Sequence, residues 1–390
     1  MPFVGGVSYG IWSLGEQEGE RIKIVELEQD CKATWPGIIQ GEYHIGLGHM
    51  ALRQPKQADT ARLHFMKAWQ KAPPASDSRD KLDRDGFLIH LARAQVFLGG
   101  TEDEIRFRDR FDWNQEVFEE IDRTVKKIDN PEARGQAVRE LAYALTLKQQ
   151  PKIALSLVRS VGAATPHARA VEIAILWSDS GKQDDAKKIA AYPEPGKGTS
   201  DLVARCGYAE GLARLDKIDD AMKLALLPGE TSHRVQALLA VAAGQSLDPK
   251  VDKSENVKNA CAEAKKLLDA NPKANVPPWV LVQHVRYTAR CDSIDAARAL
   301  ALKLPAACKR RAQLEIALAT LERVPPPDSA VAIIHELDKE GPSRALAWFA
   351  LFQSKAKANQ SFRFEPEDAE EEALQPFFNA AEKFRLAHGN

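Results

Sequence analysis

Apolar residues recur along most of this chain at intervals of three and four positions. One stretch carries Val138, Leu141, Ala142 and Leu145, and this spacing places the four side chains on one face of an α-helix. No stretch sustains an alternation of apolar and polar residues, which is the pattern of a half-buried β-strand. The pattern therefore predicts an all-α protein.

The helical pattern also repeats at a regular distance. The segment Leu141–Leu155 aligns with Ile173–Lys187 at an offset of 32 residues, and the latter aligns with Tyr208–Met222 at an offset of 35. Each segment contains a small residue that is followed twelve positions later by alanine. The pairs are Ala142 and Ala154, Ala174 and Ala186, and Ala209 and Ala221, with weaker copies at Gly46 and Ala58 and at Val285 and Ala297. Similarity at a period of 32 to 36 residues indicates a helical-repeat protein.

Each repeat is interpreted as two antiparallel helices. Small residues at a crossing point let two helices approach closely, while larger apolar residues fill the sides. A polar break separates the two helices of a repeat. Prolines stand between helices or at their starts, as at Pro166, where the missing N–H costs no helical hydrogen bond.

These residues resemble the tetratricopeptide repeat, a helix–turn–helix unit of about 34 residues. That family places a small residue in its first helix and alanine twelve positions later in its second, often with proline at the exit. Ala142, Ala154 and Pro166 follow this pattern, and the resemblance covers roughly residues 40–355. It implies a right-handed α-solenoid of antiparallel helical hairpins that binds a protein or peptide on its concave surface.

The repeats also suggest how the chain is divided. We expect an N-terminal segment with a capping helix over residues 1–34, the repeat array over 35–360, and an acidic turn with a C-terminal capping helix over 361–390. The acidic segment Glu365–Ala373 suits the start of that last helix, because the helix macrodipole favours negative charge there. A segment that docks a partner is the alternative interpretation.

Composition narrows the expected partners. The chain has 390 residues, of which 44% are hydrophobic, and a formal net charge of -1. Balanced charge gives no reason to expect a nucleic-acid or membrane-surface protein, and no apolar run is long enough to predict a transmembrane helix. Five cysteines without a CxxC pair predict small core residues in a reducing compartment. We therefore expect a cytoplasmic protein. The sequence leaves open whether an export leader has been removed, and it does not predict the oligomeric state.

The stretch PEPGKGTSD, which ends at Asp201, most resembles a phosphate-binding loop. A P-loop has the pattern GxxxxGK[ST] after a buried strand. Here Ala191 stands where the first glycine belongs, and glycine rather than Ser or Thr follows Lys197. We interpret the stretch as a loop between repeats in which Thr199, Ser200 or Asp201 caps the next helix.

The sequence lacks the other common catalytic and metal-binding patterns. It contains no HExxH or GxSxG motif, and His44 and His49 are five residues apart, which puts them on different faces of a helix. We expect no metal, no cofactor and no catalytic residue, and the leading hypothesis is an interaction scaffold or adaptor. An enzyme or regulatory subunit with a site in the solenoid groove is the first alternative. A helical-repeat RNA-binding protein is the second.

Partner-binding residues are expected on the first helices of the repeats, because these helices line the concave face of tetratricopeptide arrays. Arg286 and Arg290 share a helix face because they are four residues apart. With Trp279 they suggest a basic, partly aromatic pocket for an acidic or carboxylate group of a protein or peptide partner. Pairing of these arginines with Asp292, Asp295 or Glu315 of the chain itself is the alternative. The full set of expected partner-binding residues is Arg139, Tyr143, Glu210, Arg214, Trp279, Arg286 and Arg290.

Overall fold

A computed structural model shows an all-α protein, with no β-strand among the residues that it describes. This confirms the all-α prediction for that part of the chain. The described residues form two compact units, one of residues 128–316 and the other of residues up to 127 and from 317 onward. The boundaries predicted at 34/35 and 360/361 stay predictions. The structure describes residues 31, 37–52, 58–74, 81–99, 115–147, 151–162, 166–179, 181–190, 201–246, 254–321, 326–338, 343–357, 360–367, 369–372, 374–379 and 382.

The described part of the unit of residues 128–316 consists of paired helices, followed by the start of α17 (Ala306–Leu321). Each first helix contacts its second helix and the first helix of the next pair. The first helices are α7 (Pro131–Leu147), α9 (Pro166–Ser178), α11 (Leu202–Arg214), α13 (Thr231–Ser246) and α15 (Pro278–Cys291). The second helices are α8 (Pro151–Gly162), α10 (Gln183–Ala190), α12 (Ile218–Ala225), α14 (Ser254–Ala270) and α16 (Ile294–Leu302).

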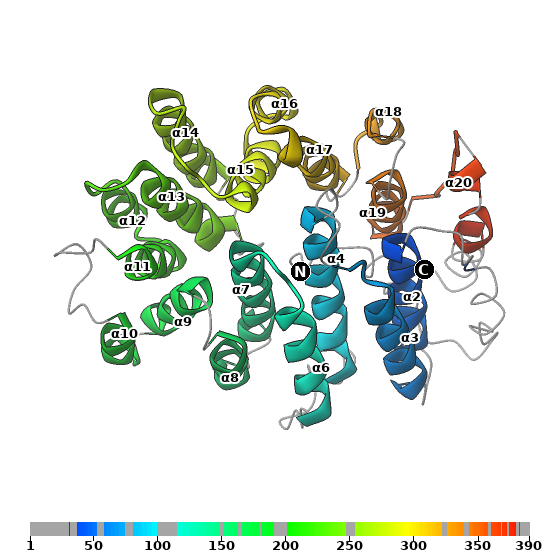
Figure 1. Ribbon diagram of the computed structural model, residues 1–390, viewed down its shortest axis with the longest axis horizontal. Helices are drawn as coiled ribbons and strands as arrows, with labels where there is room; N and C mark the ends of the chain where they lie inside the picture. The colour runs from blue at the N-terminus through cyan, green and yellow to red at the C-terminus, as the bar shows by residue number, and fades with distance from the viewer. Residues whose placement is uncertain are drawn as a thin grey trace. The chain divides into compact units, whose positions relative to one another are not determined.

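Within this unit the first helices lie side by side as the inner row of an arc, and the second helices lie on its outer side (Figure 1). The row turns back on itself, because α15 also contacts α7. We call α7, α9, α11, α13 and α15 the inner helices. Their arrangement brings side chains that are distant in sequence to one face.

The small residues of the repeat lie inside these helix contacts. The alanines of the three clearest repeats are fully buried, and so are Val285 and Ala297. The copy at Gly46 and Ala58 differs, because Ala58 is exposed. Ala58 is the first residue of α3, so it lies at the end of a helix rather than at a crossing point. The spacing of twelve is therefore a packing signal in residues 128–316 but not at Ala58.

Two glycines let neighbouring inner helices approach more closely than alanine would. A Cβ added to Gly207 on α11 would lie 2.7 Å from Ile173 Cβ and 2.8 Å from the carbonyl oxygen of Ala170 on α9. A Cβ added to Gly244 on α13 would lie 2.7 Å from the carbonyl oxygen of Glu210 on α11. Both separations are too short for a real side-chain carbon, so the close approach requires glycine.

Prolines begin several helices of this unit, in line with their predicted places between helices or at helix starts. Proline is the first residue of α7, α8, α9 and α15. Helix α11 follows Asp201, whose side chain accepts a hydrogen bond from the Val203 backbone N–H at 2.7 Å. This satisfies one of the unpaired donors of the first turn, so the N-cap prediction is confirmed at Asp201. The rest of PEPGKGTSD lies outside the described residues.

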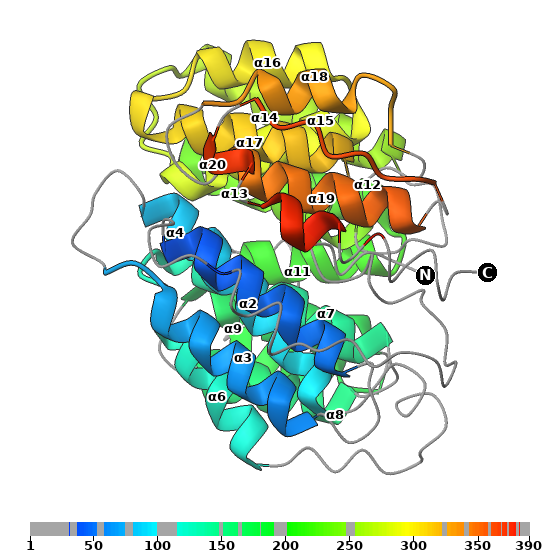
Figure 2. The same cartoon turned by 90° about the vertical axis from the view of Figure 1, so that its right-hand side faces the viewer.

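The other unit contains three helices that pack together near its start, and Figure 2 shows them side by side. They are α2 (Gly37–Leu52), α3 (Ala58–Lys71) and α4 (Lys81–Gln95). Helix α4 also packs on α6, and α19 contacts α18 and α2. The remaining elements are η2 (Val96–Gly99), α6 (Gln115–Lys126), α18 (Ala330–His335), α19 (Ser343–Lys357) and α20 (Ala369–Glu372).

Within this second unit, aromatic side chains from near the end of the chain pack against the earlier helices. The ring centroid of Phe377 lies 4.9 Å from that of Tyr43 and 5.2 Å from that of Phe349. The nearby acidic segment is held internally: Glu367 lies 2.8 Å and Glu371 3.7 Å from the Arg344 guanidinium. These contacts favour a structural role for the acidic segment.

Cys206, Cys261 and Cys308 are small buried residues, as expected of all five cysteines, whereas Cys31 and Cys291 are only half-buried. Within the described residues, no helix combines the length and the apolar character needed to cross a membrane.

Candidate functional site

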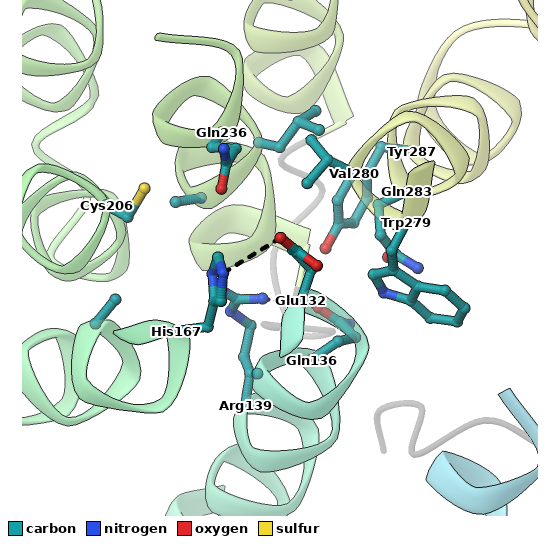
Figure 3. Close-up of a pocket in the computed structure, with 14 residues that line it drawn as sticks. Glu132, Gln136, Arg139, His167, Cys206, Gln236, Trp279, Val280, Gln283 and Tyr287 are labelled. Atoms are coloured by element: carbon teal, nitrogen blue, oxygen red, sulfur yellow. Dashed lines mark hydrogen bonds and ion pairs between the residues drawn. The ribbon is translucent and has the colours of Figure 1, made fainter. Parts of the chain in front are cut away.

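A pocket lies among the inner helices of residues 128–316, and all five contribute to its lining (Figure 3). Its volume is about 60 Å³. Sites for cofactors and drug-sized ligands are typically about 300–1,000 Å³, whereas a water molecule needs only about 10–15 Å³. The pocket therefore has room for a few waters or for one polar group of a side chain. Its labelled polar residues are Glu132, Gln136, Arg139, His167, Cys206, Gln236, Trp279, Gln283 and Tyr287.

Glu132 brings a negative charge into this pocket from the first turn of α7. Its Oε1 lies 3.6 Å from Nε2 of His167 on α9, the pair joined by the dashed line in Figure 3. Burial alone would raise the pKa of Glu132, but the neighbouring His167 and a backbone hydrogen bond outweigh this effect, so the pKa lies below its ordinary value. Glu132 is therefore ionised at neutral pH.

Arg139 lines the pocket and also belongs to a group of three charged side chains around the buried carboxylate of Glu210. Glu210 has no exposed surface, and it accepts hydrogen bonds from Arg139 Nε at 2.9 Å and from Arg214 Nη2 at 2.7 Å. Arg139 Nη1 also donates to Gln136 Oε1 at 2.7 Å. Burial would raise the pKa of Glu210, but the two guanidiniums hold it below the ordinary value. The carboxylate thus fixes both arginines in place.

A second buried carboxylate repeats this arrangement near α15. Glu315 on α17 is fully buried and accepts hydrogen bonds from Arg286 Nη1 and from Arg311 Nε, both at 2.9 Å. Burial would raise the pKa of Glu315, and again two guanidiniums lower it below its ordinary value. The guanidinium carbon of Arg311 lies 5.6 Å from the ring centroid of Trp279, within the range of a cation–π contact.

The structure brings some of the predicted partner-binding residues together and separates others. Arg139 and Trp279 line the pocket. Glu210 and Arg214 are not part of the lining and pair with charges of the chain itself in the group around Glu210.

The remaining predicted residues contribute less to this pocket. Arg286 is engaged with Glu315, as the alternative interpretation had it. Arg290 lies half-buried in the last turn of α15. The side chain of Tyr143 lies outside what the structure describes.

Two groups that line the pocket, the Cys206 thiol and the Tyr287 hydroxyl, are shifted toward their neutral forms. Burial raises the pKa of the Cys206 thiol to about 12 and that of the Tyr287 hydroxyl to about 12. A reactive cysteine requires a lowered pKa, and a general base works best with a pKa near the working pH. Within the described residues, no cluster of His, Cys, Asp and Glu could hold a metal ion.

Two buried polar atoms of the pocket have no hydrogen-bond partner in the described structure. They are Oε1 of Gln283 and Nε1 of Trp279, on residues that are only 7% and 2% exposed. The two residues are four apart on α15, so they share one face of that helix. A buried polar atom without a partner typically costs about 1–3 kcal/mol. A water molecule or a polar group of a ligand can supply partners for such atoms.

No protein-family model matches this chain, and no curated protein or solved structure matches it. The resemblance to tetratricopeptide repeats therefore rests on the repeated residues and on the pairing of the helices.

Sequence reasoning missed most of this pocket. Gln283 carried a usable signal, because it is a polar residue that lies four positions after Trp279 and directly follows the apolar run Val280–Val282. Glu132 and His167 carried none, because their proximity depends on how α7 and α9 cross.

Proposed function

We propose that this chain is a protein-interaction module, an α-solenoid of antiparallel helical pairs with a right-handed superhelix. In this proposal the inner helices hold a segment of a partner protein. The observation that carries it is the pocket to which every inner helix contributes side chains. Repeated helices that present one continuous surface are well suited to binding an extended segment.

The chemistry of the pocket supports binding over catalysis. Cys206 and Tyr287 are held neutral by burial. Arg139 is already fixed by Glu210. Side chains fixed before binding lose little conformational entropy when a partner arrives, which favours affinity.

The pocket favours a neutral polar group of the partner over an acidic one. The guanidiniums of Arg139, Arg214 and Arg286 already donate to buried carboxylates of the chain. Glu132 adds a negative charge within the pocket itself. A carboxylate of the partner would be repelled by Glu132, and these three arginines already donate hydrogen bonds to carboxylates of the chain.

Selection from a random peptide library on the immobilised full chain tests this function. Ala240 lines the pocket and is 3% exposed, so Ala240→Leu should fill it. Peptides selected on the unmodified chain should bind Ala240→Leu at least tenfold more weakly. The matched control is Ala299→Leu on α16, which adds the same atoms at an exposed position.

The thermal melting of each variant shows whether it is folded. If Ala240→Leu unfolds the chain, Gln236→Ala, at a half-buried position of the lining, replaces it in the comparison. Failure to select any peptide, or equal binding by the pocket variants and the control, would refute the proposed function at this site.

A further inference from the structure

We infer that the pocket binds a primary carboxamide, such as the side chain of a glutamine or asparagine in the partner segment. This inference rests on the proposed function and adds the chemistry of the group that enters the pocket. Its basis is the pair of buried, unpartnered atoms on α15, Gln283 Oε1 and Trp279 Nε1.

The two atoms have opposite hydrogen-bonding roles. Gln283 Oε1 is an acceptor, whereas the indole N–H of Trp279 only donates. A ligand that satisfies both must therefore donate one hydrogen bond and accept another. Because Trp279 and Gln283 lie on successive turns of one helix, one small group lying along that face can serve both atoms.

Charged groups match this pair poorly. An ionised carboxylate only accepts hydrogen bonds, so it would leave Gln283 Oε1 without a donor, and an ammonium only donates, so it would leave Trp279 Nε1 without an acceptor. Glu132 would also repel a carboxylate. A primary carboxamide has an oxygen that accepts and an NH₂ group that donates, and it carries no charge to desolvate.

A hydroxyl group also donates and accepts, but it does both from one oxygen atom. A carboxamide offers its oxygen and nitrogen at two separate positions, which suits two protein atoms from different helical turns. It also pairs with Gln283 in either orientation of that side-chain amide, because amide groups are mutually complementary.

The rest of the pocket fits a carboxamide on a short apolar stem. A volume of about 60 Å³ accepts a group of this size but no cofactor. Leu239, Ala240 and Val280 supply apolar lining. Gln236 reaches the same space from α13 (Figure 3) and is held by a hydrogen bond from its Nε2 to Ser232 Oγ at 3.2 Å.

A titration with three small probes tests the inference on the full chain. The probes are propanamide, propanoate and propylammonium, which share a stem and differ in hydrogen-bonding role. The readout is the NMR signal of the Trp279 indole N–H, assigned by its loss in Trp279→Phe. Propanamide should shift this signal saturably, with a Kd of about millimolar for so small a ligand. Gln283→Leu should weaken that binding at least tenfold, and the control Ala299→Leu should leave it unchanged.

The results separate the ligand from the function. Saturable binding of propanamide alone, lost in Gln283→Leu, supports the carboxamide. A larger saturable shift with propanoate or propylammonium overturns it, and so does the absence of saturation with all three, which assigns the pocket to water. If peptides selected on the chain still depend on Ala240 in those cases, the interaction function stands and only the carboxamide is wrong.

Discussion

Arg139 on α7 donates a hydrogen bond from Nε to Oε2 of Glu210 on α11 at 2.9 Å, across 71 residues of sequence. The two helices belong to different pairs, and α9 contacts both of them. Because Glu210 also binds Arg214, one buried carboxylate holds two positive charges and links separate parts of the inner row.

Glu210→Gln should destabilise residues 128–316 severely. The substitution keeps the size of the side chain but leaves two buried guanidiniums without their counter-charge, and breaking a buried ion pair typically costs about 3–5 kcal/mol. Denaturant unfolding followed by circular dichroism measures the change. Asp184→Asn is the control, because Asp184 pairs with Lys187 on the surface, and it should leave the transition where it was. Similar, small effects of both variants would show that the ion-paired group around Glu210 contributes little to the free energy of unfolding.

The repeat could be predicted from sequence because local packing enforces it. Ala142 and Ala154 must be small where two helices cross, and both are fully buried, so their spacing records the contact directly. The same pattern misled at Ala58, which has the right spacing but lies exposed at the start of α3. A spacing rule cannot tell a crossing point from a helix end.

The pocket was less predictable because its contacts join helices that are distant in sequence. Pairing of Arg286 with an acid of the chain was predicted as an alternative, and the structure shows this pair with Glu315. The pair of Arg139 and Glu210 was not anticipated, because it depends on how far the inner row bends between α7 and α11. Sequence periodicity indicates which side of a helix faces inward, but not which helices meet there.

Gly207→Ala should separate α11 from α9. The added Cβ would lie 2.7 Å from Ile173 Cβ and 2.8 Å from the Ala170 carbonyl oxygen, and overpacking of this kind typically costs about 1–3 kcal/mol. Thermal unfolding should show a lower midpoint for this variant. Gly181→Ala is the comparison, because its Cβ would meet only Asp179 Oδ1 at 3.6 Å. If Gly207→Ala melts no lower than Gly181→Ala, α9 and α11 are more loosely packed than the structure shows.

The Cys206 thiol should resist alkylation in the folded chain. Its pKa of about 12 leaves roughly one part in ten thousand as thiolate at pH 8, and the thiolate is the reacting form. Iodoacetamide labelling followed by mass spectrometry should therefore modify Cys206 only after unfolding. A denatured sample labelled in parallel confirms that the peptide is detected. Rapid labelling of Cys206 in the native chain would mean that the thiol is ionised or exposed, and the proposed binding role would then need revision.

His284 should make residues 128–316 sensitive to acid. Burial lowers its pKa from 6.5 to about 4, and its Nε2–H donates to the Cys261 carbonyl oxygen at 2.9 Å. The imidazole of His284 therefore becomes protonated near pH 6.5 in the unfolded chain but only near pH 4 in the folded chain. The contribution of His284 to the free energy of unfolding is fully present above pH 6.5, and it falls by about 3 kcal/mol as the pH drops toward 4.

The variant His284→Gln keeps an N–H donor but has no titrating ring. Its free energy of unfolding, measured by denaturant unfolding from pH 7 to pH 4, should therefore lose this part of the pH dependence. The control His233→Gln alters a partly exposed histidine, and this variant should keep the pH dependence of the unmodified chain. If both variants show the same pH profile as the unmodified chain, His284 is not the acid-sensitive group.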